Sequence, residues 1–277
     1  MTSTRRALCA GINIFKNLPA NNFLQGCVND AHDMAAVLKD FLGFTDADIT
    51  ILADAQATKA AIMAKLQSMV ADAKAGKLNY LVFSLSSHGT QMPDANGDEP
   101  DGADEAFCPY DLAQKGNQWD PAHIIVDDEL HDLFVQLPSN VLLEVYLDTC
   151  HSGTGLRALD MLLDRRPRYL PPPSLEAFEQ VDGCHGRGLR RGLVEKGLVH
   201  NILWAGCRSD QTSADAHIGG TWHGAFTYFW VKEMRACQNK LSRSAILKKV
   251  VADLKAGKYS QVPQLECEAT VRSLPMS

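Results

Sequence analysis

The sequence lacks the features that mark several classes of protein. Its eight cysteines form no Cys-x-x-Cys pair and are spread along all 277 residues, which disfavours a zinc ribbon or a disulfide scaffold. No apolar run approaches the length of a membrane span, and no N-terminal stretch has the composition of a signal peptide. We therefore expect free thiols in a reducing cytoplasm and no membrane partner.

A surplus of basic residues is also absent. The formal net charge is −6, which argues against a general nucleic-acid binder. A nucleotide- or flavin-binding doubly wound domain would need a Gly-rich loop after its first strand, but residues 11–15 contain only one glycine. With 45% apolar and 22% charged residues, the composition is typical of a globular protein with a substantial core.

Short apolar runs alternate with segments of helical periodicity. The predicted strands are residues 7–13, 48–52, 79–85, 141–147, 201–205 and 261–265, and the predicted helices are residues 29–42, 58–74, 221–235 and 242–255. This alternation predicts an α/β fold with a mainly parallel central sheet flanked by helices on both faces. Two long polar segments, residues 89–126 and 156–197, interrupt the pattern, and segments of this length are usually functional or disordered.

Two of the apolar runs end in reactive side chains. His88 follows the strand predicted at 79–85, and Cys150 follows the strand predicted at 141–147. If the two strands are parallel neighbours, both side chains reach the carboxyl edge of the sheet, where open α/β sheets hold their active sites. A thiol beside an imidazole is the minimal machinery for nucleophilic acyl transfer.

Plainer interpretations of these residues remain open. A cysteine is often a small buried hydrophobe, and a lone histidine is usually a structural or surface residue. Cys150 lies in a polar turn, however, whose backbone N–H groups could stabilise a thiolate and then an oxyanion. His151 is an alternative base, but side chains of adjacent residues diverge, which favours His88 as the partner of Cys150.

Residues around the two reactive side chains form longer motifs, Ser-Ser-His-Gly-Thr-Gln at 86–91 and Asp-Thr-Cys-His-Ser-Gly at 148–153. These motifs resemble the His and Cys signatures of metacaspases, the caspase-like cysteine peptidases of clan CD (peptidase family C14). Further segments resemble the family in order, namely residues 26–31, 101–105, 207–214, 223–227 and 261–264. The matches extend from residue 7 to about residue 265. Ser87 departs from the pattern, because the family usually has glycine before the histidine.

The resemblance implies a caspase–haemoglobinase fold and a prokaryotic metacaspase-like enzyme. One caspase-like domain would comprise a large catalytic subregion (1–155), a connecting loop (156–197) and a small subregion (198–277). The implied function is a monomeric cysteine endopeptidase that cleaves proteins and peptides after Arg or Lys. His88 and Cys150 would form the catalytic dyad, and the N–H groups of Gly89 and Cys150 would hold the oxyanion.

The resemblance also implies the residues of the primary specificity (S1) pocket, namely Cys27, Asp30, Ser86 and Asp148. Two carboxylates can bind a guanidinium by charge-assisted hydrogen bonds and would disfavour an acidic P1 residue. From the residues alone, Asp30 could equally cap a helix N-terminus and Asp148 could be a turn residue that accepts local N–H groups.

Many metacaspases require calcium, and the resemblance places candidate ligands at Asp101 or Asp104, and at Asp127 and Asp128. Clustered carboxylates suit calcium, although they could also form an ordinary solvated acidic loop. The family's fourth carboxylate position falls on Arg157, whose cation would repel the metal. We therefore expect that no cofactor is required, with calcium as the alternative.

The loop at 156–197 is basic, rich in Pro and Gly, and expected to be exposed. An enzyme that cuts after arginine would find candidate processing sites there, at Arg165, Arg166, Arg168, Arg187, Arg190 and Arg191. We predict that this loop is a self- or trans-processing site that covers the active site beforehand; an ordinary solvated loop is the alternative. For the whole chain, the alternative function is a catalytically silent caspase-like adaptor that acts through protein binding.

Overall fold

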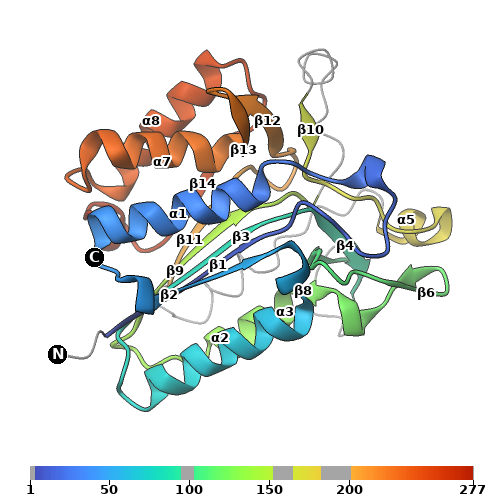
Figure 1. The fold of residues 1–277 in the computed structure, drawn as a ribbon, viewed down its shortest axis with the longest axis horizontal. Coiled ribbons are helices and arrows are strands. Elements are labelled where there is room, and N and C mark those ends of the chain that lie inside the picture. Colours follow the sequence, from blue (N-terminus) through green and yellow to red (C-terminus); the bar gives the residue numbers. More distant parts are fainter. Residues whose placement is uncertain (1–3, 95–102, 152–164, 182–200, 277) are drawn as a thin grey trace.

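The chain folds into three layers, with a central sheet between two layers of helices (Figure 1). The computed structural model describes residues 4–94, 103–151, 165–181 and 201–276. The strands of the central sheet are β1 (Arg5–Gly11), β2 (Ile49–Ala53), β3 (Tyr80–Ser86), β9 (Leu142–Asp148), β11 (Asn201–Ala205) and β14 (Gln264–Glu266). They lie in the order β14-β11-β9-β3-β1-β2, and only β14 is antiparallel to its neighbour. Each predicted strand is therefore present, with ends shifted by a few residues, and the predicted fold class is confirmed.

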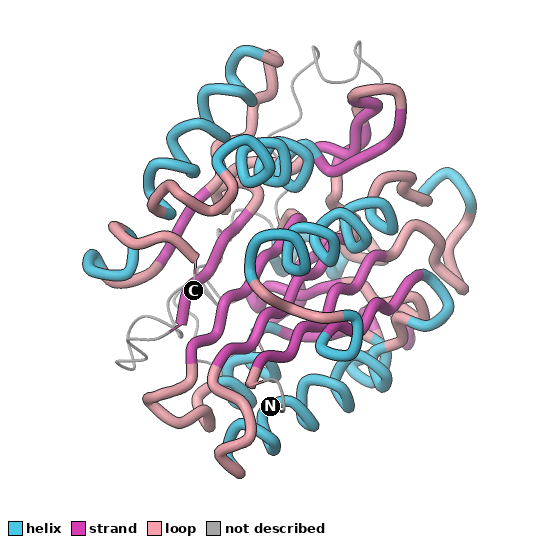
Figure 2. The backbone as a smooth tube through the Cα atoms, turned by 60° about the vertical axis from the view of Figure 1, so that its left-hand side comes forward, coloured by secondary structure: helices cyan, strands magenta, loops and turns pink. Residues whose placement is uncertain are grey.

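Helices cover both faces of this sheet (Figure 2). The helices on one face are α1 (Cys27–Leu42), α7 (Ala225–Cys237) and α8 (Arg243–Ala256), and those on the other are α2 (Lys59–Lys74) and α3 (Asp127–Phe134). Successive residues of β1 alternate between the two cores, since Ala7 packs in the cluster of α1 whereas Leu8 packs in the cluster of α2. Burial on both faces explains why the strands appear in the sequence as continuous apolar runs.

The segment at 89–126 contains more structure than the sequence suggested. It includes a three-stranded antiparallel sheet formed by β4 (Gly89–Pro93), β5 (Ala103–Phe107) and β8 (Ile125–Val126), and a short hairpin of β6 (Gln114–Lys115) and β7 (Gln118–Trp119). All of β5 is buried although it carries Asp104 and Glu105. Because these acidic residues interrupt the apolar pattern, the strand could not be recognised from the sequence.

The helix predicted at 221–235 begins later than expected. Residues Thr221–Gly224 form β13, which pairs with β12 (Ala214–Ile218), and helix α7 starts only at Ala225. The turn between the two strands uses Gly219 and Gly220, whose φ angles of 63° and 95° favour glycine. A third strand, β10 (Arg166–Pro167), adds to the free edge of β12. Two short helices, α5 (Leu175–Val181) and α9 (Ala269–Arg272), complete the described part of the chain.

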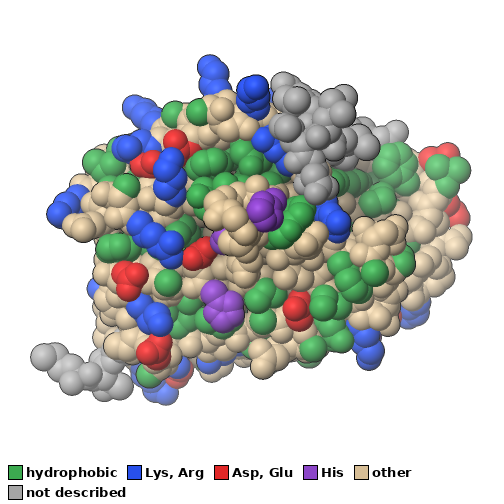
Figure 3. All heavy atoms as spheres, turned by 45° about the horizontal axis from the view of Figure 1, so that its top comes forward, with side chains coloured by type: hydrophobic (Ala, Val, Ile, Leu, Met, Phe, Trp, Pro, Cys, Tyr) green, Lys and Arg blue, Asp and Glu red, His purple; other side chains and the backbone are tan. Residues whose placement is uncertain are grey.

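Charged side chains of both signs lie on the surface. On the face drawn in Figure 3, basic and acidic side chains are interspersed and do not gather into one patch. Among the described residues, no helix combines the length and apolar character needed to cross a bilayer.

Candidate active site

The two reactive side chains predicted from the sequence follow neighbouring strands. β3 and β9 pair in parallel, and their last residues, Ser86 and Asp148, lie opposite each other. His88 and Cys150 each come two residues further on, so both lie at the carboxyl edge of the sheet. Both are buried, with exposed fractions of 4% and 0%.

The imidazole of His88 is oriented by the backbone. Its Nε2 lies 2.8 Å from the carbonyl oxygen of Asn22, so Nε2 carries the proton and donates it. Nδ1 is buried and makes no hydrogen bond to a described residue. Burial lowers the pKa of His88 to about 4, whereas the backbones of Asn22 and Arg168 act in the opposite direction. The imidazole is therefore neutral, with Nδ1 free to accept a proton.

The thiol of Cys150 is enclosed. The backbone N–H of Ser213 donates to its sulfur, and the sulfur of Cys207 lies 3.9 Å away. Burial raises the pKa of the Cys150 thiol, and the neighbouring Cys207 raises it further. In this state the candidate nucleophile is a neutral thiol and the candidate base is a neutral imidazole.

A segment of the chain itself covers this pair. Arg166 and Pro167 pair with β12, and the N–H of Arg168 donates to the carbonyl oxygen of Ser213 at 3.0 Å. The carbonyl oxygen of Arg168 accepts hydrogen bonds from the N–H groups of Gly89 at 2.9 Å and Cys150 at 3.2 Å. These are the two N–H groups predicted to hold an oxyanion.

The side chain of Arg168 fills a pocket of carboxylates and has no exposed surface. Its Nη2 lies 2.7 Å from Asp30 and 2.9 Å from Asp215, and its Nη1 lies 3.3 Å from Asp148. Burial works against the charged guanidinium, but Cys27 and these three carboxylates surround it, and the net effect raises the pKa of Arg168 well above its ordinary value. A buried cation is thus compensated by charges on several sides.

The two carboxylates predicted from the sequence are held by distant parts of the chain. Asp30 accepts the N–H of Gly224 at 3.0 Å, and Asp148 accepts the hydroxyl of Thr227 at 2.7 Å. The N-cap of α1 is Gly26, so the alternative that Asp30 caps the helix is wrong. Asp148 likewise accepts hydrogen bonds from groups far along the chain, the hydroxyl of Ser213 and the N–H of Thr227.

Asp215 is a pocket residue that the sequence did not reveal. Its carboxylate accepts the N–H groups of Gln25 at 2.8 Å and Gly26 at 3.0 Å while it binds Arg168. It lies in β12, one residue beyond the family-like segment 207–214, and that neighbourhood was the only available signal.

Small residues leave room for the guanidinium. Cys27 and Ser86 are buried, at the start of α1 and at the end of β3. A Cβ atom on Gly224 would overlap both Asp148 and Arg168, so only glycine keeps the pocket open. Ser87, the departure from the family pattern, donates its hydroxyl to the carbonyl of Cys108 at 2.6 Å and is satisfied in place.

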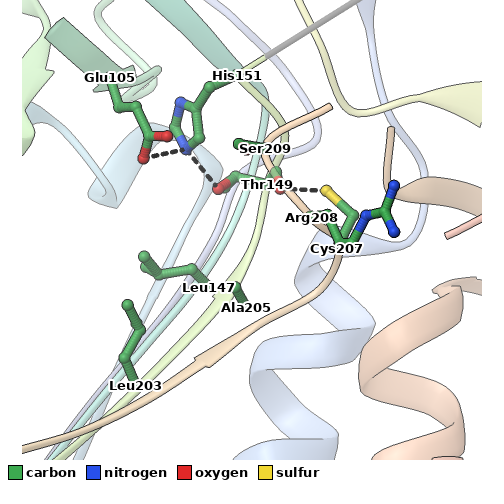
Figure 4. A pocket seen from close by; sticks show the side chains of 9 residues that line it. All are labelled: Glu105, Leu147, Thr149, His151, Leu203, Ala205, Cys207, Arg208 and Ser209. Atoms are coloured by element: carbon green, nitrogen blue, oxygen red, sulfur yellow. Dashed lines mark hydrogen bonds and ion pairs between the residues drawn. The ribbon is translucent and has the colours of Figure 1, made fainter. Parts of the chain in front are cut away.

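His151, the alternative base, is engaged elsewhere. Its Nδ1 lies 3.2 Å from the carbonyl oxygen of Thr90, and its Nε2 lies 3.4 Å from the hydroxyl of Thr149 and 3.9 Å from Glu105 (Figure 4). Burial lowers its pKa to about 4. Neither ring nitrogen is turned to Cys150, which leaves His88 as the better-placed base.

The candidate calcium ligands do not form a donor set on their own. Asp104 lies in β5, and Asp127 and Asp128 lie at the start of α3. In the part of the chain that the structure describes, no three His, Cys, Asp or Glu residues are arranged to hold a metal ion. Asp101 and Arg157 lie outside the described residues. The described residues therefore do not fit a calcium site.

The other processing candidates do not occupy the pocket where they are described. Arg165 lies over the ring of Tyr259, 3.6 Å from its centroid, and Arg166 donates to the carbonyl of Phe23 at 3.0 Å. The remaining candidates, outside the described residues, are Arg187, Arg190 and Arg191. The expectation that the loop is exposed is wrong at Arg168, because three carboxylates draw its side chain inside.

Comparisons with known proteins identify the family to which this chain belongs. Residues 5–159 match the family model described as the metacaspase, peptidase C14 domain. A metacaspase-1A from Aspergillus fumigatus is 33% identical over 96% of this chain and 69% of its own length. A metacaspase-1 from Coccidioides immitis is also 33% identical, over 96% of this chain and 62% of its own.

Solved structures agree on the fold. A protein from Geobacter sulfurreducens superimposes with a TM-score of 0.67 and 25% identity, over 99% of this chain and 98% of its own. Caspase-1 from Spodoptera frugiperda superimposes with a TM-score of 0.58 and 14% identity, over 95% of this chain and 88% of its own, which confirms the caspase–haemoglobinase fold. The chain belongs to the metacaspases of peptidase family C14 and is a cysteine-type endopeptidase.

Proposed function

We propose that this enzyme cleaves peptide bonds after Arg, and more weakly after Lys, with Cys150 as nucleophile and His88 as base. The observation that carries the proposal is the position of Arg168, whose side chain binds the carboxylates while its carbonyl accepts the N–H groups of Gly89 and Cys150. A substrate whose P1 arginine adopts this position has its scissile carbonyl polarised at the nucleophile.

The charges of the pocket explain the choice of P1. A guanidinium offers a planar fork to the carboxylates, whereas an ammonium reaches them as a single point charge, so Arg is preferred over Lys. An acidic P1 side chain would add a like charge to Asp30, Asp148 and Asp215 in a site without exposed surface, which costs several kcal/mol. The proposed substrates are therefore proteins and peptides with a basic P1 residue.

The reaction uses only groups of this chain. His88 takes the thiol proton at Nδ1, since Nε2 already donates to Asn22. The Cys150 thiolate attacks the scissile carbonyl, and the N–H groups of Gly89 and Cys150 hold the oxyanion. The imidazolium then protonates the leaving amine, and water hydrolyses the thioester.

The first substrate is the chain's own loop. Arg168 is the described arginine that occupies the pocket, so the proposed cleavage separates Arg168 from Tyr169. Until that bond is cut, residues 166–170 keep Cys150 buried and exclude other substrates. The proposal therefore includes self-inhibition followed by self-processing. It also includes a monomeric state, a cytoplasmic location and activity without calcium.

Hydrolysis of three matched fluorogenic peptides with Arg, Lys or Asp at P1 tests this function. We expect the Arg peptide to be cleaved fastest and the Asp peptide not at all, and we expect Cys150→Ala to be inactive. Cleavage after Asp alone would contradict the pocket, and activity in Cys150→Ala would contradict the nucleophile. Absence of all hydrolysis, including self-cleavage, in a folded wild type would favour the adaptor function instead.

A further inference from the structure

A second thiol lies directly behind the nucleophile. The sulfur atoms of Cys150 and Cys207 are 3.9 Å apart, and the two side chains are 0% and 7% exposed. β9 and β11 are parallel neighbours, and their pairing continues beyond the strand ends, since Gly206 donates its N–H to the carbonyl of Leu147 at 2.8 Å. Adjacent strands lie about 4.8 Å apart, close to the separation that a disulfide spans.

Cys207 also faces a small cavity. The cavity has a volume of ≈ 30 Å³, and Glu105, Thr149 and His151 line it together with Cys207 (Figure 4). One water molecule needs roughly 10–15 Å³ of such volume, so the cavity has room for a molecule the size of a small hydroperoxide next to Cys207, whereas Cys150 does not line it.

We propose that a hydroperoxide converts Cys150 and Cys207 into a reversible disulfide that switches the protease off. The Cys150 thiolate attacks a peroxide oxygen, an S–O bond forms, the O–O bond breaks, and the leaving oxygen takes a proton. The sulfur of Cys207 then attacks the sulfenic sulfur of Cys150, an S–S bond forms, and water leaves with the Cys207 proton. Two electrons pass from the two thiols to the peroxide, and a dithiol returns them by exchange.

The state of the loop decides when this reaction occurs. While Arg168 occupies the pocket, Cys150 is buried and its thiol pKa is raised by burial, so little thiolate is present. Once the loop has left, the thiolate that serves proteolysis also reacts with peroxide. The processed enzyme is therefore the oxidant-sensitive form, and Cys207 protects its nucleophile from further, irreversible oxidation.

Mass spectrometry of the processed enzyme after brief treatment with hydrogen peroxide, followed by alkylation, tests the disulfide itself. The proposed cut after Arg168 places Cys150 and Cys207 on different fragments. We therefore expect a species, absent before peroxide and lost on reduction, in which the two fragments are joined, and a cross-linked pair of peptides that contain Cys150 and Cys207. Absence of that pair, with Cys150 found as sulfinic or sulfonic acid, would overturn the proposal. This readout does not depend on proteolytic activity, so it stands apart from the proposed function on which the inference rests.

Recovery of activity tests the consequence. After peroxide and then dithiothreitol, wild type and the matched control Cys237→Ser should return to within about twofold of their untreated activity. Cys207→Ser, compared with its own untreated activity, should stay at least about tenfold inhibited, because its sulfenic acid oxidises further. Equal recovery in Cys207→Ser and wild type would overturn the resolving role, and if Cys207→Ser does not fold, the cross-linked peptides of wild type decide alone.

Discussion

The guanidinium of Arg168 and the carboxylate of Asp30 lie 2.7 Å apart in a pocket where neither side chain has exposed surface. Arg168 comes directly after β10, and Asp30 comes from the first turn of α1, so the contact joins residues 138 positions apart. Asp148 and Asp215 bind the same guanidinium, so an arginine of the chain itself fills the pocket that we propose to be the specificity pocket.

The carboxylate of Asp215 should matter as much for specificity as those predicted from the sequence. Removing one partner of a buried charge pair costs about 2–4 kcal/mol, so Asp215→Asn should lower kcat/KM for an Arg peptide by roughly 30- to 1000-fold. Asp46→Asn is the matched control, because the side chain of Asp46 is 90% exposed. If Asp215→Asn retains activity within about twofold of wild type, Asp215 does not contribute to the pocket.

Acid should destabilise the uncleaved protein, in which Arg168 occupies the pocket. Burial lowers the pKa of His88 and of His151 from the ordinary 6.5 to about 4, so the unfolded chain binds protons more readily. The free energy of unfolding is therefore highest above pH 6.5 and decreases as the pH falls towards about 4. The decrease amounts to up to about 3 kcal/mol for each imidazole.

The thermal midpoint of the uncleaved Cys150→Ala protein across this pH range measures the effect. The midpoint should fall as the pH decreases, and the additional substitution His151→Gln should make the fall smaller. A midpoint that stays constant, or that rises on acidification, would show that other groups dominate.

Calcium should have little effect on hydrolysis. Arg157 occupies the position of an expected carboxylate ligand, and the described residues hold no cluster of three metal-binding side chains. Activity of the processed enzyme on an Arg peptide should therefore differ by less than about twofold between millimolar calcium and a chelator. A large activation by calcium, abolished by Asp127→Asn, would contradict this expectation.

A second buried ion pair should govern stability, not catalysis. Arg243 donates to both oxygens of Glu144 at 2.9 and 3.2 Å and to the carbonyl of Pro275 at 2.6 Å, so it connects α8 and the C-terminal segment to the centre of the sheet. Arg243→Ala leaves a buried carboxylate without its cation and should lower the free energy of unfolding by about 3–5 kcal/mol.

Denaturant unfolding of Cys150→Ala with and without Arg243→Ala measures this loss. The matched control is Arg208→Ala, which breaks an ion pair whose partners are 50% and 47% exposed, and it should leave the unfolding midpoint unchanged. Equal midpoints for all three proteins would contradict a stabilising role of Arg243.

The sequence predicted the parts of the site that follow strands. His88 and Cys150 could be placed because apolar runs identify parallel strands, and parallel strands end at one edge. Asp30 and Asp148 could be assigned through resemblance to a family. Asp215 could not, because a single aspartate within a short hairpin strand has no local pattern that distinguishes it from a surface residue.

The position of Arg168 also could not be predicted from the sequence. Six arginines in a basic loop were equivalent candidates by composition, and what singles out Arg168 is tertiary, namely pairing of Arg166 and Pro167 with the edge of β12. That edge exists only because residues 221–224 form a strand where helical periodicity was expected.

The intact masses of wild type and Cys150→Ala after prolonged incubation test the central claim most directly. The account predicts that wild type yields one fragment ending at Arg168 and another beginning at Tyr169, and that Cys150→Ala and Arg168→Ala lack this cut while Arg166→Ala retains it. A wild type without any fragment ending at Arg168, or the same cut in Cys150→Ala, would contradict it.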